Sequence, residues 1–287
     1  MLKKIIWRLK FLLLESWGKN LYVVLYTVFP FIRAGKDGRI HILEKQGLLT
    51  WNEEKHFISF NTLTIHYGDK APISDIISIF FYHHPFVQKN FIKNSAFPFE
   101  GPYEEAGAAL KEGDVVIDAG ANIGIFSLFA SQKVGTEGQV IAFEPIQETR
   151  VLLEKNISSH PIRNIKASHF ALGEKTGTTT FSKDTGLLGS SGIFSKGENS
   201  EEVMEITLDE YVQINGIKKV DFIKADIEGM ERSLLKGAEK TIREHKPKVA
   251  ICIYHLPDDP EVILGLLKSF VPEYKFFKTD TKLFAYL

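Results

Sequence analysis

The segment that most constrains the fold lies near the middle of the chain and reads GDVVIDAGANIGIFSLFASQKVGTEGQVIAFEP, residues 113–145. Its apolar run at residues 115–117 is typical of a strand buried on both faces. A turn with glycines follows, and residues 125–131 then predict a buried helix that stops at Gly135. Residues 139–143 predict a second apolar strand. The segment therefore predicts half of a nucleotide-binding βαβ unit.

The turn favours a ligand with positive charge over a pyrophosphate. Glycines let the backbone approach a ligand closely, and the helix that follows offers free N–H groups there. A dinucleotide-binding turn needs G-x-G-x-x-G, but Ala121 and Asn122 follow Gly120 in this chain. The next glycine, Gly124, gives acid-x-G-x-x-x-G with Asp118 as the acid. A carboxylate there suits an amine or a cation, so the turn favours S-adenosylmethionine, which carries an ammonium and a sulfonium.

Other residues are expected to line the same ligand site. Glu144 ends the second strand, just before Pro145, and is expected to accept hydrogen bonds from both ribose hydroxyls. Glu104 precedes the first strand and is expected near the mouth of the pocket. Its alternative role is that of a carboxylate at a helix N-terminus. Ala171 lies in a stretch, residues 169–172, that is expected to face an adenine ring.

Composition excludes some classes of function. The formal net charge of −1 gives no global electrostatic attraction to nucleic acid, so we expect no nucleic-acid partner. The single cysteine, Cys252, excludes an internal disulfide and suits a reducing compartment, which favours a cytoplasmic location. The nine histidines lack the i, i+2 or i, i+4 spacing of a compact metal site, so we predict no metal unless distant residues assemble one.

Residues 1–34 predict an amphipathic and apolar helical segment. The apolar run at residues 21–32 is too short to span a bilayer, and Pro30 breaks it. Two interpretations stay open. Residues 1–33 lie on a membrane surface as a basic amphipathic segment, giving peripheral membrane contact, or they pack against the domain or a second subunit, giving self-association.

Residues 35–100 predict a small α+β accessory region. Alternation at residues 39–43 and 56–67 suggests an antiparallel sheet or hairpins. Residues 74–86 predict a helix with Ser74 as its N-cap.

Residues 101–287 predict the cofactor-binding domain. We expect a short helix that ends near Gly113, followed by the βαβ segment. Further helices are expected at residues 147–157, 207–214, 230–245 and 261–270, and further strands at 165–172, 178–181, 220–225 and 249–254. A loop is expected at 182–202 and a hairpin of 274–278 with 282–286. Strands alternating with helices and ending in a hairpin predict an α/β, doubly wound sheet with a C-terminal antiparallel hairpin.

Two motifs in this order resemble those of the FkbM family of S-adenosylmethionine-dependent methyltransferases. The first is GDVVIDAGANIG at residues 113–124, and the second comprises TLDEY, VDFIKADIEGME and LKGA at residues 207–211, 220–231 and 235–238. The resemblance extends from about Tyr103 to the C-terminus. It implies a class I methyltransferase Rossmann-like fold and methyl transfer, usually to oxygen, often in polysaccharide or natural-product assembly. It also implies that Asp118, Gly120, Asn122 and Gly124 form the cofactor turn and that Glu144 holds the ribose.

Three residues that end strands on the ligand side are the catalytic candidates: Asp226, Glu228 and His255. A hydroxyl acceptor must lose its proton during methyl transfer, and a carboxylate or histidine can remove it. One of the three is expected to act as this base, or Asp226 is expected to position the acceptor and face the methyl donor. The alternative is that Asp226 and Glu228 cap the helix that follows them.

The expected acceptor is a small-molecule or glycan hydroxyl. Two other functions stay open. A nicotinamide-dependent oxidoreductase would have the same kind of sheet, but the turn lacks the glycine spacing that a dinucleotide-binding site needs. A non-catalytic, cofactor-binding and membrane-docked partner of a glycan-assembly complex would bind S-adenosylmethionine without transferring its methyl group.

Overall fold

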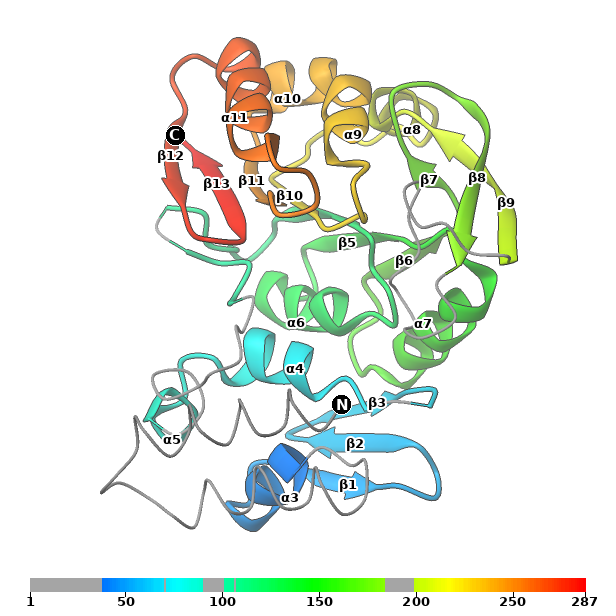
Figure 1. Ribbon diagram of the computed structural model, residues 1–287, viewed down its shortest axis with the longest axis vertical. Helices are drawn as coiled ribbons and strands as arrows, with labels where there is room; N and C mark the ends of the chain where they lie inside the picture. Colours follow the sequence, from blue (N-terminus) through cyan, green and yellow to red (C-terminus); the bar gives the residue numbers. More distant parts are fainter. Residues whose placement is uncertain (1–37, 70, 90–100, 106, 184–198) are drawn as a thin grey trace, which may run out of the picture. The chain divides into compact units, whose positions relative to one another are not determined.

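The computed structural model describes residues 38–69, 71–89, 101–105, 107–183 and 199–287 (Figure 1). The chain forms two compact units, Met1–Gly101 and Pro102–Leu287. The predicted helical segment of residues 1–34 lies outside the described residues. Within the described ranges, no helix has both the length and the apolar character that crossing a membrane requires.

The first unit contains a three-stranded antiparallel sheet in the order β1-β2-β3. Its described elements are α3 (Gly38–Lys45), β1 (Thr50–Asn52), β2 (Phe57–Phe60), β3 (Leu63–His66), α4 (Ile73–Ile76), the π-helix η1 (Ile77–Phe81) and α5 (Pro85–Val87). The hairpin predicted within residues 56–67 is confirmed, because β2 and β3 pair antiparallel.

Two predictions for the first unit are wrong. Residues 39–43 belong to the helix α3 and not to a strand. Ile40 and Leu43 lie three residues apart and are both buried, so they share one face of that helix. Five residues are too few to distinguish this spacing from the alternation of a strand. Ser74 is not an N-cap, because α4 already begins at Ile73.

The second unit is built on a seven-stranded sheet in the order β12-β13-β11-β10-β4-β5-β6 (Figure 1). Its strands are β4 (Val115–Ala119), β5 (Gln139–Phe143), β6 (Ile165–Ser168), β10 (Phe222–Ala225), β11 (Lys248–Cys252), β12 (Lys275–Lys278) and β13 (Lys282–Tyr286). The strands from β11 to β6 in this order are parallel, and β13 pairs antiparallel with both β11 and β12. The predicted doubly wound sheet with an antiparallel C-terminal hairpin is therefore confirmed.

Helices cover both faces of this sheet. They are α6 (Ile125–Val134), α7 (Gln147–Ser159), α8 (Leu208–Ile214), α9 (Glu231–Gly237), α10 (Glu239–His245) and α11 (Asp259–Phe270). Ile117 on one face is buried in a core with residues of α8 to α11. On the other face Phe222 contacts Phe126 of α6, and Ala142 packs with Leu153 of α7. The central strands are thus buried on both faces, as their apolar sequences predict.

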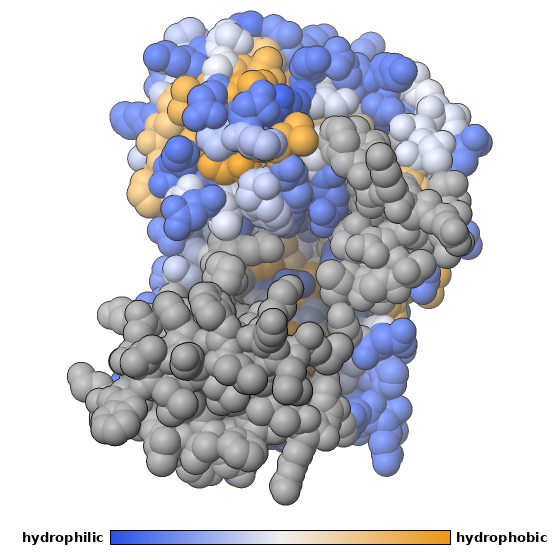
Figure 2. Space-filling model, in the orientation of Figure 1, coloured by the Kyte–Doolittle hydropathy of each residue, from blue (hydrophilic) through white to orange (hydrophobic). Residues whose placement is uncertain are grey.

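The surface of the second unit leaves few large apolar side chains exposed. Figure 2 shows a mainly hydrophilic face, with an apolar area over α11 and the neighbouring hairpin. Cys252 is fully buried in β11.

The third predicted strand, residues 165–172, is divided in the structure. Residues 165–168 form β6 of the main sheet, whereas β7 (Ala171–Leu172) belongs to a second sheet, β7-β9-β8, with β8 (Gly177–Lys183) and β9 (Asn199–Ile206). The predicted loop of residues 182–202 is therefore wrong at its C-terminal end, where β9 already begins. Polar residues fill the start of β9, so its sequence lacks an apolar strand signal. Residues 184–198 lie outside the described residues.

The long helix predicted for residues 230–245 is two helices in the structure, α9 and α10. They are separated at Ala238, whose φ of −116° and ψ of 6° are not helical. The carboxylate of Asp209 accepts hydrogen bonds from Lys240 N and Thr241 N. These backbone N–H groups lie in the first turn of α10, where they have no partner within the helix. The described residues just before Gly113, 101–105 and 107–112, contain no helix, so the short helix predicted there is also wrong.

Candidate functional site

The carboxyl ends of four neighbouring strands bring the predicted site residues to one edge of the sheet. Ala119 at the end of β4 pairs with Phe143 of β5 on one side and with Ala225 of β10 on the other. Ala225 in turn pairs with Ile251 of β11. The residues that follow these strands therefore meet at this edge, where open α/β sheets bind ligands.

The turn after β4 is held by the neighbouring strand. The N–H groups of Gly120 and Ala121 both donate to the carbonyl oxygen of Phe143, at 3.1 and 2.9 Å. Gly120 has a φ of 75°, and a Cβ atom there would lie 1.9 Å from the backbone oxygen of Asp226. Glycine is thus required by close contact with the next strand end, as well as by backbone conformation.

The rest of the turn leads into α6 with left-handed backbone. Asn122 has a φ of 52°, and Gly124, at the N-cap position of α6, has a φ of 92°. No side chain caps this helix start. The backbone N–H of Asn122 donates to Glu144 at 3.0 Å, which joins the turn to the end of β5.

Asp118 is fully buried beneath the turn, and its carboxylate contacts protein groups. One oxygen accepts a hydrogen bond from Ser127 at 2.5 Å, and the other lies 3.1 Å from the ammonium of Lys224. Lys224 also donates to the carbonyl oxygens of Ala119 and Gly120, at 3.2 and 2.7 Å. Asp118 therefore acts on the turn through Lys224. A direct contact of Asp118 with the cofactor stays a prediction.

The charge of Lys224 is secured by its acidic neighbours. Burial lowers the pKa of Lys224, but the carboxylates of Asp118 and Asp226 more than offset this and raise it above its ordinary value. The sequence analysis missed this residue. The signal was the one charge within the otherwise apolar residues 222–225, because a charged side chain in a buried strand needs a partner.

Glu144 occupies the end of β5, as predicted. Its oxygens accept hydrogen bonds from Asn122 N and Ile146 N, each at 3.0 Å. Burial raises the pKa of Glu144 to about 7, although these two hydrogen bonds oppose the shift. Arg150 donates to the carbonyl oxygens of Glu144 and Pro145 and fixes this corner. The carboxyl group is therefore near its titration midpoint at neutral pH.

Two of the predicted cofactor residues contact other parts of the second unit. Glu104 accepts a hydrogen bond from Leu110 N at 2.7 Å, and its second oxygen lies 3.4 Å from Lys133. Ala171 is buried in β7, where it pairs with Glu205. A role of Glu104 or Ala171 toward the cofactor stays a prediction.

Asp226 follows β10 and is held by two tyrosines. Tyr103 donates to one of its oxygens at 2.7 Å, and Tyr254, which is 43% exposed, donates to the other at 3.3 Å. Burial raises the pKa of Asp226, but Lys224 and Tyr103 more than offset this and hold it below its ordinary value. Asp226 is thus ionised at the strand end.

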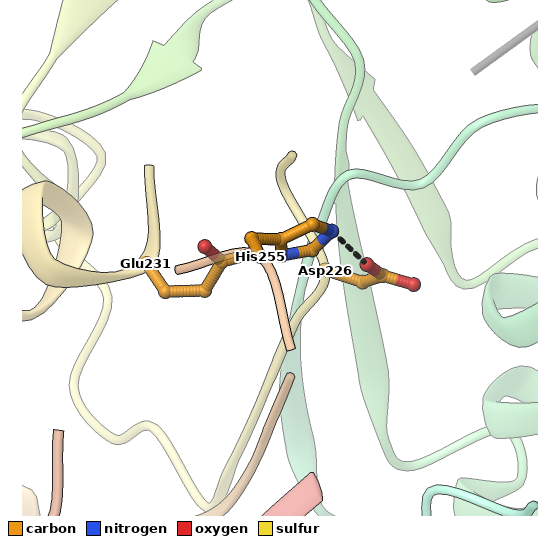
Figure 3. Close-up of side chains that lie close together, drawn as sticks. All are labelled: Asp226, Glu231 and His255. Atoms are coloured by element: carbon orange, nitrogen blue, oxygen red, sulfur yellow. Dashed lines mark ion pairs between the residues drawn. The ribbon is translucent and has the colours of Figure 1, made fainter. Parts of the chain in front are cut away.

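Three carboxylates surround the imidazole of His255, and Figure 3 shows two of them, those of Asp226 and Glu231. Nδ1 lies 3.0 Å from Glu231, and Nε2 lies 3.5 Å from Glu228 and 3.7 Å from Asp226. Burial lowers the pKa of His255, but Glu228 and Glu231 more than offset this and raise it to about 10. The structure therefore brings all three predicted catalytic residues together and adds Glu231.

Glu231, the first residue of α9, holds the loop that precedes this helix. Its oxygens accept hydrogen bonds from Ile227 N at 2.8 Å and Gly229 N at 3.1 Å. Glu228 itself has a φ of 54°, a left-handed conformation that costs about 1–3 kcal/mol in a residue other than glycine. Such strain is typical of functional sites.

Two buried lysines and an aromatic ring, all missed in the sequence, lie behind Asp226. The Lys224 and Lys282 ammonium groups lie 5.3 and 4.4 Å from the centroid of the Tyr103 ring, within cation–π range. Tyr103 lies before β4 and Lys282 in the C-terminal hairpin, so only the folded chain places them beside Asp226.

Comparison with known proteins gives a consistent set of similarities. The model of the methyltransferase FkbM domain matches residues 118–277, more than half of the chain. The hexuronic acid methyltransferase AglP of Haloferax volcanii is 28% identical over 160 residues, which are 55% of this chain and 63% of that protein. The 31-O-demethyl-FK506 methyltransferase FkbM of Streptomyces tacrolimicus is 29% identical over 170 residues, 48% of this chain and 64% of that protein.

A solved structure shows a similar fold. The methyltransferase FkbM of Methylobacillus flagellatus KT aligns with a TM-score of 0.52 and 25% sequence identity. The alignment covers 66% of this chain and 48% of that chain. This chain thus spans less than two thirds of the length of each of these three proteins.

Proposed function

The chain belongs to the FkbM methyltransferase family, and from this membership we propose that it transfers the methyl group of S-adenosylmethionine to a hydroxyl group of a sugar or natural product. The family uses S-adenosylmethionine, and the class I methyltransferase fold predicted from the two motifs is confirmed. The observation that carries the proposal is the meeting of the Gly120 turn, Glu144 and Asp226 at one sheet edge.

The donor site follows from this geometry. The turn from Gly120 to Gly124 approaches the ligand through backbone, and Glu144 receives the ribose hydroxyls. Asp226, at the end of the neighbouring strand, faces the donor with an ionised carboxylate that complements the sulfonium charge. None of the residues assigned to the donor site is needed to bind a phosphate, because S-adenosylmethionine carries no phosphate.

The chemical step is an in-line displacement at the methyl carbon. The acceptor oxygen forms a bond to the methyl group as the bond to sulfur breaks, and the hydroxyl proton passes to a carboxylate. Alignment and exclusion of water supply most of the rate enhancement, and a positioned base adds roughly 10²–10⁴-fold. Asp226 and Glu228 are the proposed bases, because both lie beside His255 at the strand ends.

A hydroxyl acceptor fits the local charge better than an anionic acceptor does. Asp226, Glu228 and Glu231 place three carboxylates around one imidazole. A carboxylate acceptor would meet repulsion from this cluster. We therefore propose a hydroxyl of a neutral acceptor, on a sugar or a related natural product.

A two-part experiment tests the proposal. Calorimetry with S-adenosylmethionine and with NAD measures which cofactor binds, and radiolabelled S-adenosylmethionine then measures methyl incorporation into a panel of sugars, uronic acids and lipid-linked glycans. We expect binding of S-adenosylmethionine alone, and transfer that falls at least about 10²-fold in Asp226→Asn or Glu228→Gln. Asp280→Asn, in the exposed turn of the C-terminal hairpin, is the control that keeps full activity.

Two outcomes contradict the proposal. Normal turnover in both carboxylate variants would remove the base assigned to them. Binding of S-adenosylmethionine without transfer to any acceptor on the panel would favour the non-catalytic, cofactor-binding alternative.

A further inference from the structure

The imidazole of His255 is buried without aligned hydrogen bonds. Its side chain is only 9% exposed, and neither ring nitrogen makes an aligned hydrogen bond with another described residue. Nδ1 lies at ion-pair distance from Glu231, but Nε2 is at least 3.5 Å from each carboxylate that faces it, so the surroundings of Nε2 indicate a ligand such as an ion or an ordered water. Carboxylate oxygens face both of its nitrogens.

We propose that this cluster is a binding site for a divalent metal ion, with His255 Nε2 and the carboxylates of Asp226 and Glu228 as ligands. Figure 3 shows two of these ligands, Asp226 and His255, together with Glu231. Nε2 lies 3.7 Å from Asp226 Oδ1 and 3.5 Å from Glu228 Oε2. Two ligand atoms that are each about 2.0–2.2 Å from one ion lie at most about 4.4 Å apart. Each separation allows that carboxylate and Nε2 to bind the same ion.

Glu231 supports this site from the other side of the ring. Its Oε1 lies 3.0 Å from Nδ1 of His255, and backbone N–H groups hold both of its oxygens in place. A histidine that binds a metal usually gives its second nitrogen to a carboxylate, which fixes the ring. One donor atom from each of Asp226, Glu231 and His255 lies within 4.8 Å of the other two, so the cluster is compact.

The surroundings of the other ligands fit the same role. Asp226 is oriented by hydrogen bonds from Tyr103 and Tyr254, as ligating carboxylates commonly are. Glu228 is 34% exposed, so its side chain has room to adjust to an ion.

The charge of the cluster also favours a dication. Three carboxylates face one imidazole, which leaves excess negative charge even when the imidazole is a cation. The ammonium of Lys224 is already engaged with Asp118 and two backbone carbonyls. Oxygen ligands with one imidazole suit Mn²⁺ or Mg²⁺. When bound, such an ion polarises an acceptor hydroxyl, a role that rests on the proposed methyl transfer.

The test uses Mn²⁺ with the chelator-treated full chain and no methyl donor. Titration followed by electron paramagnetic resonance should show one Mn²⁺ bound per chain, and pulsed measurement should show coupling to an imidazole nitrogen. Asp226→Asn and His255→Gln should weaken binding at least about 10-fold, and Glu231→Gln by about 10–100-fold through loss of ring support. Asp280→Asn should bind Mn²⁺ like the unmodified chain.

The nitrogen coupling needs no variant, so the proposal can be tested even where a variant fails to fold. Absence of stoichiometric Mn²⁺ binding, or bound Mn²⁺ without nitrogen coupling, overturns the site. Methyl transfer that persists unchanged in EDTA overturns the role in acceptor activation and leaves the proposed function intact. Mn²⁺ binding without any transfer contradicts the proposed function and leaves the metal site intact.

Discussion

Lys224 and Asp118 form an ion pair beneath the cofactor turn, with Nζ 3.1 Å from Oδ1 and both side chains buried. Lys224 also holds the carbonyl oxygens of Ala119 and Gly120. The acid of the first motif thus shapes the turn from within the protein. Asp118, which the sequence predicts to contact the ligand, thus also helps to fix the backbone of the turn.

Removing one partner of this pair should destabilise the protein strongly. Asp118→Asn leaves the Lys224 charge buried without its carboxylate, so we expect the free energy of unfolding to fall by about 3–5 kcal/mol. Urea denaturation measures this change. The control is Glu174→Gln, which breaks the exposed pair of Lys236 and Glu174 and should cost less than about 1 kcal/mol. Equal costs for the two variants would refute a structural role for the buried pair.

Gly120 should tolerate alanine far less well than another glycine of similar conformation. Gly113 and Gly120 have φ angles of 81° and 75°, but a Cβ atom meets nothing within 4 Å at Gly113 and lies 1.9 Å from the oxygen of Asp226 at Gly120. Gly113→Ala should cost about 1–2 kcal/mol of unfolding free energy from conformation alone. Gly120→Ala should cost clearly more and weaken donor binding. Similar unfolding curves for the two variants would mean that the close approach at Gly120 relaxes freely.

The sequence predicts the central sheet and its glycine turn well, because the apolar runs and the glycines between them indicate the same strand-turn-helix order. Residues 140–143 are a continuous apolar run, and β5 spans Gln139–Phe143 as predicted. The capping sequence at Thr207 begins α8 as predicted, with Thr207 Oγ1 accepting from Glu210 N at 3.1 Å. The strand ends at Asp226 and His255 are also placed correctly, since parallel strands bring their carboxyl ends to one edge.

The parts that the sequence does not predict depend on distant contacts. α9 and α10 are separate because Asp209, from α8, satisfies the start of α10. The site partners Tyr103 and Lys282 lie outside the motif that contains Asp226, and tertiary packing alone brings them together. Glu231 lies within that motif, but its contact with His255 requires β11 beside β10.

The hydrogen bond from Tyr103 to Asp226 should contribute more to stability than the one from Tyr254. The first is 2.7 Å long and joins a buried tyrosine to a carboxylate whose side chain is 20% exposed, whereas the second is 3.3 Å long and comes from an exposed tyrosine. Tyr103→Phe should lower the free energy of unfolding by about 1.5–3 kcal/mol, as expected for a hydrogen bond to a charged group. Tyr254→Phe should lower it by less than about 1 kcal/mol. The reverse order in thermal or urea unfolding would contradict this ranking.

Glu144 should make the stability of the free protein fall as pH rises. Burial raises its pKa from 4.5 to about 7, so between these values the folded chain retains a proton that the unfolded chain has released. Stability decreases with pH wherever the folded state binds more protons, and the full difference is about 3 kcal/mol. Glu144→Gln has no such proton. The unfolding free energy of the unmodified chain, relative to this variant, should therefore decline from pH 4.5 to 7 and level off above it.

The same titration should couple donor binding to pH. Ribose hydroxyls donate hydrogen bonds and so favour the ionised carboxylate of Glu144, which is only partly populated below about pH 7 in the free protein. The affinity for S-adenosylmethionine should therefore rise from pH 5.5 to 7 and flatten above that range. Calorimetry at pH 6 in two buffers of different ionisation enthalpy should detect proton release on binding, and Glu144→Gln should abolish this release. Proton uptake, or release that persists in the variant, would show that Glu144 does not receive the ribose.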